Sequence, residues 1–204
     1  MELKKIGALA LLVGGLLLAS GCGSTVAQTG PVPIATPETI AQLEEGARKE
    51  GAIVSYGLPD DWANWKESWA TFTQRYGLKH QDTDMSSAEE IQKFKAERNR
   101  PQADVGDIGI QFGPTAVAEG VTMAYKNSHW NEIPDWAKDP EGNWVAWYTG
   151  TMSIMVNKNL VANTPKTFKD LLKPEYKGKI AFGDPRQAAN ANWAVFAAAF
   201  ALGG

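Results

Sequence analysis

The chain has 204 residues and a formal net charge of −3 at pH 7, with no run of basic residues, which argues against a nucleic-acid partner. Its single cysteine excludes an intramolecular disulfide. The sequence after residue 36 is long enough for one medium-sized domain or two small ones, and it contains no internal repeat.

The N-terminus has the three-part pattern of an export signal. Lys4 and Lys5 precede an uncharged apolar run over residues 6–18, and the small residues "ASG" then lead to Cys22. The apolar run is too short for a transmembrane helix, so residues 1–22 are predicted to be a signal peptide. The stretch "LLLASGC" resembles the bacterial lipobox, which predicts a lipid on Cys22 and a membrane anchor. An ordinary signal peptide with a chance cysteine is the alternative.

Helical and strand patterns alternate after a short tether. Residues 23–36 are small, polar and proline-bearing, which predicts a flexible segment. Helical patterns follow at 36–51, 61–77 and 84–99, and strand patterns at 52–56, 78–83 and 103–110. This alternation predicts an α/β fold with a mainly parallel sheet. Ligands of such sheets bind beyond the carboxyl ends of the strands, where loops meet helix starts.

Two groups of residues in these helices have more than one interpretation. Trp62, Trp65 and Trp69 recur at helical spacing and are predicted to be core rather than a ligand platform. Ser86 and Ser87 each precede a glutamate by three residues, so either serine fits a capping box at a helix start. Capping alone and capping combined with a ligand contact both fit this pattern.

The pattern changes after Gly113. A helix and a short strand are predicted over 114–125, two extended stretches around Gly150 within 144–160, a short helix capped by Thr167, and a strand at 179–182. The last helix, "WAVFAAAFAL", is apolar on most faces and is therefore expected to have partners on more than one side.

Three stretches carry a family resemblance. Residues 157–185, "NKNLVANTPKTFKDLLKPEYKGKIAFGDP", resemble the signature of bacterial extracellular solute-binding proteins of the iron/polyamine-type cluster, the binding subunits of ABC importers. Residues 101–121 and 147–157 are similar to that family's passages between lobes. The resemblance implies a two-lobed, periplasmic-binding-protein-like (type II) receptor that closes on a solute and docks on a permease.

The same resemblance implies an organisation for this chain. The first α/β lobe would span 37–113, and 114–204 would be the start of a second α/β lobe. Because the family's chain continues past this point, we expect a truncated receptor that exposes apolar surface and binds its solute weakly. The resemblance implies a location in the periplasm or on the outer face of the cytoplasmic membrane. It implies neither a cofactor nor a metal centre.

The resemblance also implies ligand-binding residues by their position. In the first lobe they are Gly57, Asp60, Ser86, Ser87, Gln111 and Phe112. In the second they are Tyr148, Arg186, Asn190 and Asn192. Many family members have Ser, Gly and Thr where this chain has "RQAANAN", which weakens the prediction of a plain anion cradle.

The solute stays open at this point among a polyamine, a phosphonate, another small ion and a ferric species. Carboxylates near residue 60 favour a cation, whereas serines at a helix start and Arg186 favour an anion. Trp144 and Trp147 would suit a cationic ligand as an aromatic wall.

The sequence leaves two other function classes as alternatives. An exported enzyme would need a nucleophile with a base or closely spaced metal ligands, and neither His80 nor His129 lies in such a motif. Asp60 and Asp61 are better explained as favourable charges at a helix start than as an acid/base pair. A surface adhesin or scaffold without a transport role remains an alternative and predicts no stabilisation by small solutes.

Overall fold

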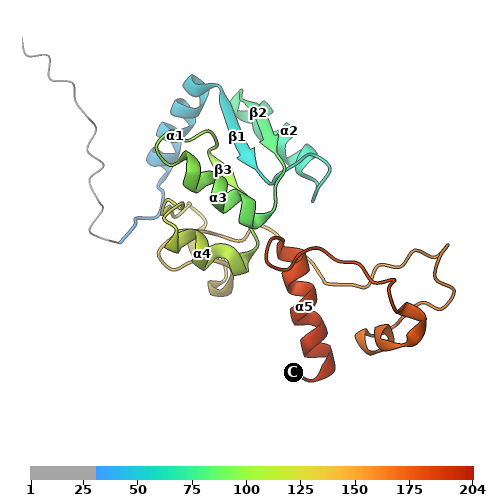
Figure 1. The fold of residues 1–204 in the computed structure, drawn as a ribbon. Helices are drawn as coiled ribbons and strands as arrows, with labels where there is room; N and C mark the ends of the chain where they lie inside the picture. Colours follow the sequence, from blue (N-terminus) through green and yellow to red (C-terminus); the bar gives the residue numbers. More distant parts are fainter. Residues whose placement is uncertain (1–30) are drawn as a thin grey trace, which may run out of the picture. The chain divides into compact units, whose positions relative to one another are not determined.

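The computed structural model describes residues 31–204 (Figure 1). The predicted signal peptide, Cys22 and the tether up to residue 30 lie outside the described residues. Helices and strands alternate through the first part: α1 (Pro37–Glu50), β1 (Ala52–Tyr56), α2 (Trp65–Tyr76), β2 (Lys79–Thr83), α3 (Ser87–Glu97) and β3 (Val105–Gly106). The predicted α/β class is confirmed for this part.

The ends of two helices are fixed by side-chain caps. The Thr36 hydroxyl accepts a hydrogen bond from the Thr39 amide (3.4 Å) at the start of α1, and Gly51 ends that helix with a φ of +74°. At the start of α3, the amide and the hydroxyl of Ser86 both donate to Glu89 Oε2, at 2.9 and 2.7 Å. Of the two predicted capping boxes, the one that begins at Ser86 is formed.

The sheet has three parallel strands in the order β2-β1-β3. Ser55 of β1 pairs in register with Asp82 of β2 and with Val105 of β3. Successive residues of β1 face opposite sides: the Ser55 hydroxyl bonds to the His80 ring, which stacks on Trp69 of α2, whereas the Tyr56 ring packs on Phe94 of α3. Helices α2 and α3 therefore cover opposite faces of the sheet.

Helix α2 corrects the prediction made for its tryptophans. It begins at Trp65 instead of residue 61, because Ala63 and Asn64 have φ values of +45° and +63° and cannot continue a right-handed helix. Trp69 is buried, but Trp62 lies before the helix and is 49 % exposed. The prediction of a core series was right for Trp69 and wrong for Trp62.

Short elements dominate the chain after β3. They are η1 (Ile110–Phe112), α4 (Gly113–Ala118), η2 (Trp130–Glu132), η3 (Asp135–Ala137), η4 (Phe168–Leu172) and η5 (Pro174–Tyr176), followed by the longer helix α5 (Ala189–Leu202). The predicted Thr167 cap is present, since its hydroxyl accepts from the Asp170 amide at 3.2 Å. The helix it caps is a 3₁₀ helix rather than an α-helix.

The strands predicted after β3 are not formed in the described residues. Residues 114–126, 144–160 and 179–182 contain no strand, and bridge pairing there is limited to isolated bridges of Lys126 with Ile34 and of Val145 with Lys138. A strand needs a neighbour for its backbone hydrogen bonds, and these stretches have none over their length. The division into lobes at residues 113 and 114 remains a prediction.

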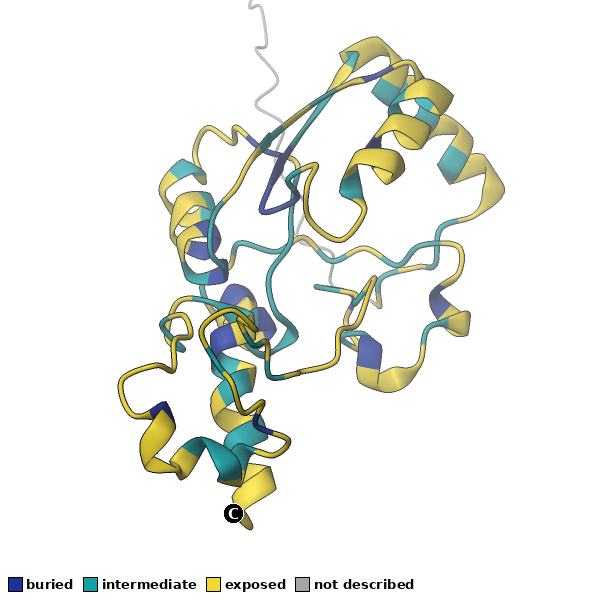
Figure 2. Ribbon diagram, turned by 90° about the vertical axis from the view of Figure 1, so that its right-hand side faces the viewer, coloured by how far each residue is buried: buried dark blue, intermediate teal, exposed yellow. Residues whose placement is uncertain are grey.

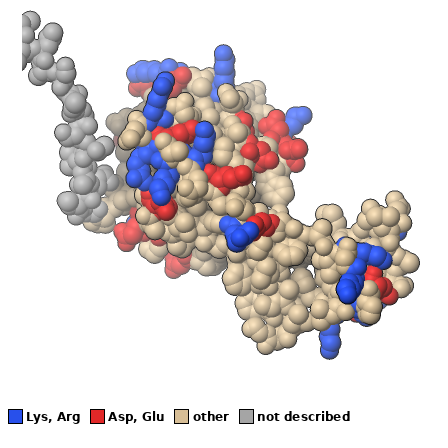
Figure 3. All heavy atoms as spheres, in the orientation of Figure 1, with Lys and Arg blue, Asp and Glu red and all other residues tan. Residues whose placement is uncertain are grey.

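Burial differs along the described chain. Figure 2 shows buried residues around the sheet and its loops, whereas α5 is mostly intermediate or exposed. Only Ala191 of α5 is buried, and Phe200 is 77 % exposed. Acidic and basic side chains are interspersed over the face in Figure 3, and the α5 end of that face is largely uncharged. None of the helices in residues 31–204 is both long and apolar enough to cross a bilayer.

Candidate solute-binding site

The loops that follow the three strands meet at one edge of the sheet. Gly57 follows β1, Asp84 follows β2 and Asp107 follows β3. The Gly57 amide donates to the Thr83 carbonyl and the Asp107 amide to the Tyr56 carbonyl, both at 3.1 Å, so the backbones of these loops are held side by side. In an open α/β sheet this is the edge at which ligands bind.

Glu90 of α3 lies beneath this edge. Its exposed fraction is 0 %, and neither carboxyl oxygen has a hydrogen-bond partner among residues 31–204. The side chain fills the space between Gly57 and Gly106: a Cβ on Gly57 would overlap Glu90 Oε1, and one on Gly106 would lie 2.7 Å from Glu90 Oε2. Gly57 also has a φ of +72°, so this predicted site position serves both the turn and the buried carboxyl.

Asp107 connects the edge to a segment far along the chain. Its carboxylate accepts hydrogen bonds from the Tyr148 hydroxyl (2.6 Å) and from Trp147 Nε1 (3.2 Å). Trp62 Nε1 in turn donates to the Tyr148 hydroxyl oxygen at 3.1 Å. The Trp65 ring lies 5.0 Å from the Trp147 ring and 6.3 Å from the Tyr148 ring, both edge to face. The predicted residue Tyr148 therefore lies against the strand edge.

Within residues 31–204, the carboxyl groups of Glu90 and Asp107 have no cationic side chain as a partner. Burial and, to a smaller extent, the negative charge of Asp107 together raise the pKa of Glu90 to about 9, although the Asp107 backbone amide lowers it in part. Burial also raises the pKa of Asp107, while the hydrogen bonds from Tyr148 and Trp147 lower it in part. Burial and the bond to Asp107 raise the pKa of Tyr148 to about 12. No ion pair within residues 31–204 involves Glu90 or Asp107.

The two predicted serines differ in their bonding. The Ser86 hydroxyl is used in the cap, because it donates to Glu89. Ser87 is buried, and its hydroxyl oxygen accepts from the Gly109 amide at 3.1 Å, which ties the start of α3 to the loop after β3. Within residues 31–204 the Ser87 hydroxyl forms only this accepted bond, so its donor capacity is unused.

The start of α5 lies against the same loops. Gln111 Nε2 donates to the Ala189 carbonyl, and the Ala88 amide of α3 donates to the Gln187 carbonyl, both at 3.1 Å. Gln111 Oε1 is buried and has no partner in the described part of the chain. The structure thus brings the predicted residues Ser87 and Gln111 together with the segment that precedes α5.

The other predicted residues of that segment make local contacts. The Arg186 guanidinium binds Asp184 through Nε (2.9 Å) and a terminal nitrogen (2.6 Å). Asn190 Oδ1 accepts from the next amide at 2.7 Å, and Asn192 Nδ2 donates to the Pro185 carbonyl at 3.1 Å. These bonds shape the turn before α5.

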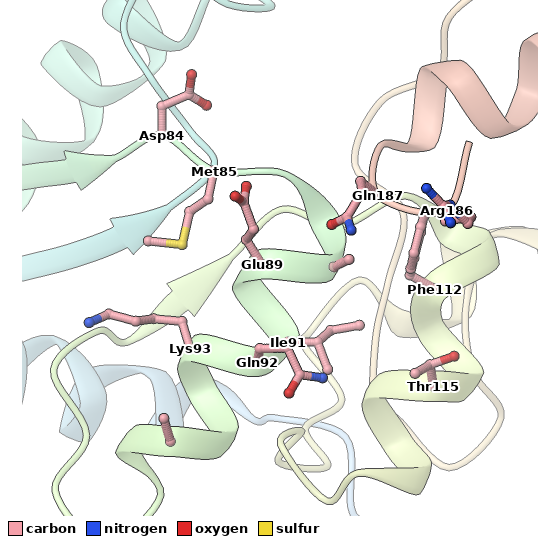
Figure 4. A pocket seen from close by; sticks show the side chains of 12 residues that line it. Asp84, Met85, Glu89, Ile91, Gln92, Lys93, Phe112, Thr115, Arg186 and Gln187 are labelled. Atoms are coloured by element: carbon pink, nitrogen blue, oxygen red, sulfur yellow. The ribbon is translucent and has the colours of Figure 1, made fainter. Parts of the chain in front are cut away.

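Asp60 and Phe112 lie away from the carboxyl cluster. Asp60 is exposed in the loop between β1 and α2, and its carbonyl accepts from the Lys66 amide at 3.2 Å. Phe112 lines an open groove of about 940 Å³ beside α3, together with Arg186 and Gln187, which face Glu89 across the opening (Figure 4). Neither Glu90 nor Asp107 lines this groove.

The histidines and acids do not form a catalytic or metal centre in the described chain. The Ser55 hydroxyl contacts both His80 Nε2 (2.8 Å) and Asp82 Oδ1 (2.5 Å), but the acid binds the serine rather than the histidine, unlike the order in a hydrolase triad. His129 is exposed and pairs with Glu132 at 3.0 Å. No three His, Cys, Asp or Glu side chains within residues 31–204 are grouped so as to hold a metal ion.

Comparison with known proteins identifies the family. Residues 101–203, half of the chain, match the bacterial extracellular solute-binding proteins. The chain belongs to this family. The resemblance inferred from the sequence is thereby confirmed, and the family is one of binding proteins found outside the cytoplasm.

Individual relatives in this family match this chain over alignments of 135 residues. An uncharacterized protein of Haemophilus influenzae is 33% identical, over 61% of this chain and 39% of the relative. Proteins of Salmonella typhimurium and Salmonella paratyphi A, both named "Putative 2-aminoethylphosphonate-binding periplasmic protein", are 27% identical, over 66% of this chain and 39% of theirs. The chain thus spans about two fifths of the length of these relatives.

Sequence reasoning missed part of the strand edge of this solute-binding protein. Asp107 directly follows a strand, a position at which a carboxylate indicates a ligand loop, so the sequence carried a signal for it. Glu90 carried none, because glutamates in helices usually face solvent. Trp62 was assigned to the core because its spacing matched that of Trp65 and Trp69.

Proposed function

We propose that this chain is the solute-capturing part of a receptor that delivers its solute to an ABC permease. The solute would bind at the strand edge, between the loops that follow β1, β2 and β3 and the segments around Tyr148 and Gln187. The family and the names of its Salmonella relatives support a transport receptor. An exported enzyme is not proposed, since no side-chain arrangement in the described residues favours one.

One observation carries this proposal. Two segments far apart in sequence meet at the loop after β3: Trp147 and Tyr148 donate to the Asp107 carboxylate, and Trp62 donates to the Tyr148 hydroxyl. The three aromatic side chains are nevertheless 42–49 % exposed. Exposed aromatic groups fixed around a charged group at a strand edge are the usual composition of a small-molecule site.

The groups at the edge favour a small organic ion that carries charges of both signs. The Ser87 hydroxyl, at the N-terminal end of α3, favours an anionic head group, and the unpaired Gln111 Oε1 offers an acceptor. The acids Glu90 and Asp107 favour a positive charge. An aminophosphonate, such as the solute named for the Salmonella relatives, has both features. A polyamine has only the second.

The experiment is a thermal-shift screen of the purified full chain. The panel contains 2-aminoethylphosphonate, other phosphonates, polyamines, sulfate, thiamine and ferric chelates. A solute at one hundred times its Kd should add about 2.7 kcal/mol to the free energy of unfolding. The variant Tyr148→Phe, which loses the bridge between Trp62 and Asp107, should show a smaller shift. No shift with any solute would contradict the receptor and favour an adhesin or scaffold.

We also propose that the receptor is held at the outer face of the cytoplasmic membrane by a lipid on Cys22, which the lipobox-like stretch supports. The variant Cys22→Ala should then be released into the soluble fraction of a bacterial host. Membrane retention equal to that of the parent chain would contradict the lipid anchor.

A further inference from the structure

The carboxyl group of Glu90 is not explained by the packing of the sheet. It is fully buried, and both of its oxygens lack a partner in the described chain, which is unfavourable for any polar group. Both of its neighbours at the strand edge are glycines, and a Cβ at either Gly57 or Gly106 would enter the space of the carboxyl. The fold therefore leaves space for the Glu90 carboxyl group, although the burial of this group lowers the stability of the folded chain.

Every charged group that faces Glu90 from the surrounding elements is also acidic. Asp107 follows β3, and Asp82 and Asp84 lie at the end of β2. Asp82 Oδ1 accepts from the Leu58 amide at 3.0 Å, whereas its Oδ2 is buried without a partner. The phenol of Tyr148 also faces this cluster, and its pKa is raised in part by the charge of Glu90. A site of this composition attracts a cation.

The side chains of the site favour an organic cation over a metal ion. The acids are not grouped closely enough to coordinate a metal in the part of the chain that the structure describes. Trp62, Trp147 and Tyr148 are linked to Asp107 by hydrogen bonds and are 42–49 % exposed, and aromatic rings attract a cation through their faces. Each Asp107 oxygen accepts one hydrogen bond and can accept another. A primary ammonium has three N–H donors for these oxygens.

We propose that Asp107 and Glu90 form a carboxyl pair that binds the primary ammonium group of the solute against Trp62, Trp147 and Tyr148. This inference rests on the proposed function, because it requires that a solute enters the strand edge. Asp107 is the direct partner of the ammonium, and Glu90 is the buried carboxyl behind it. Glu90 is protonated at neutral pH in the empty receptor, and the arriving positive charge favours its ionised form. Capture then transfers the Glu90 proton to the buffer.

The test compares two probes that differ only in the amine. Isothermal titration of the full chain with 2-aminoethylphosphonate and with ethylphosphonate, at pH 7, should give at least tenfold tighter binding of the amine. The variant Asp107→Asn should lose this preference. Repeating the titration in buffers of different ionisation enthalpy counts the protons released. Glu90→Gln should release fewer protons than the parent chain, by up to one, with the same probe.

Two further variants keep the test informative. Asp135→Asn removes one negative charge from the exposed η3 and should retain the preference and the proton release. Trp62→Leu replaces an exposed ring and should weaken the preference even where Asp107→Asn does not fold. Equal affinity for both probes in the parent would overturn the subsite and leave the receptor intact. Unchanged preference in Asp107→Asn, or unchanged proton release in Glu90→Gln, would also overturn it. Binding of no panel solute would overturn the receptor as well.

Discussion

The part of the chain from α1 to β3 and the part that follows α4 contrast in how they satisfy their backbone and bury their side chains. In the first part, β1 is hydrogen-bonded on both sides and Ser55, Tyr56 and Leu58 are buried. In the second part, the described residues form no strand, and Met155 and Phe182 are 97 % and 62 % exposed. Both parts have apolar stretches of strand length, so an apolar stretch alone does not produce a strand. A paired neighbour is also required.

The largest expected effect is a dependence of the free energy of unfolding on pH, which Glu90 gives to the first part. Glu90 has a folded-state pKa of about 9 against an ordinary value of 4.5, so above pH 4.5 the unfolded chain binds fewer protons than the folded one and stability falls as pH rises toward 9. Glu90→Gln removes this loss. The variant and the parent should have nearly the same free energy of unfolding at pH 5, and the variant should be more stable by about 4 kcal/mol at pH 8.

Urea denaturation at several pH values measures this difference. Glu175→Gln, an exposed glutamate in η5 of the second part, is the matched control and should change stability by less than about 0.5 kcal/mol at every pH. A parent chain as stable at pH 8 as at pH 5 would show that Glu90 is not buried as described.

Core truncation gives the next largest contrast. Leu58 has an exposed fraction of 0 %, so Leu58→Ala leaves a cavity and should cost about 3 kcal/mol. Leu172 is 71 % exposed in η4, and Leu172→Ala should cost less than about 0.5 kcal/mol. Equal losses in chemical denaturation would mean that the second part buries its apolar residues as the first part does.

The smallest expected effect concerns Ser86 and Ser87 at the start of α3. Replacing Ser86 and Ser87 together by Ala removes the cap and the acceptor of the Gly109 amide, and should cost about 1 kcal/mol of stability. If the serines also bind the solute, affinity for 2-aminoethylphosphonate should fall by more than tenfold.

Ser68→Ala is the control for the serine pair, because this exposed hydroxyl of α2 bonds to the Asn64 carbonyl, at 3.2 Å, and to no other group within residues 31–204. It should leave affinity unchanged. A loss of stability in the double variant without a loss of affinity would restrict Ser86 and Ser87 to capping.

Local rules in the sequence were sufficient for the elements of the first part. Thr36, Ser86 and Gly51 act within a few residues of themselves, so the caps and ends of α1 and α3 could be predicted before the fold was known. The parallel sheet followed from the alternation of patterns, and the family followed from motifs in residues 101–185.

Contacts between distant segments were decided only by the tertiary structure. The spacing of Trp62 matched that of a core residue, but the positive φ values at Ala63 and Asn64 place it outside the helix, where its indole reaches Tyr148, 86 residues later. The burial of Glu90 beneath the strand edge depends on the packing of α3 against the sheet and on the space that Gly57 and Gly106 leave. The strands expected in the second part failed for the same reason, because backbone pairing depends on neighbours that the local sequence does not specify.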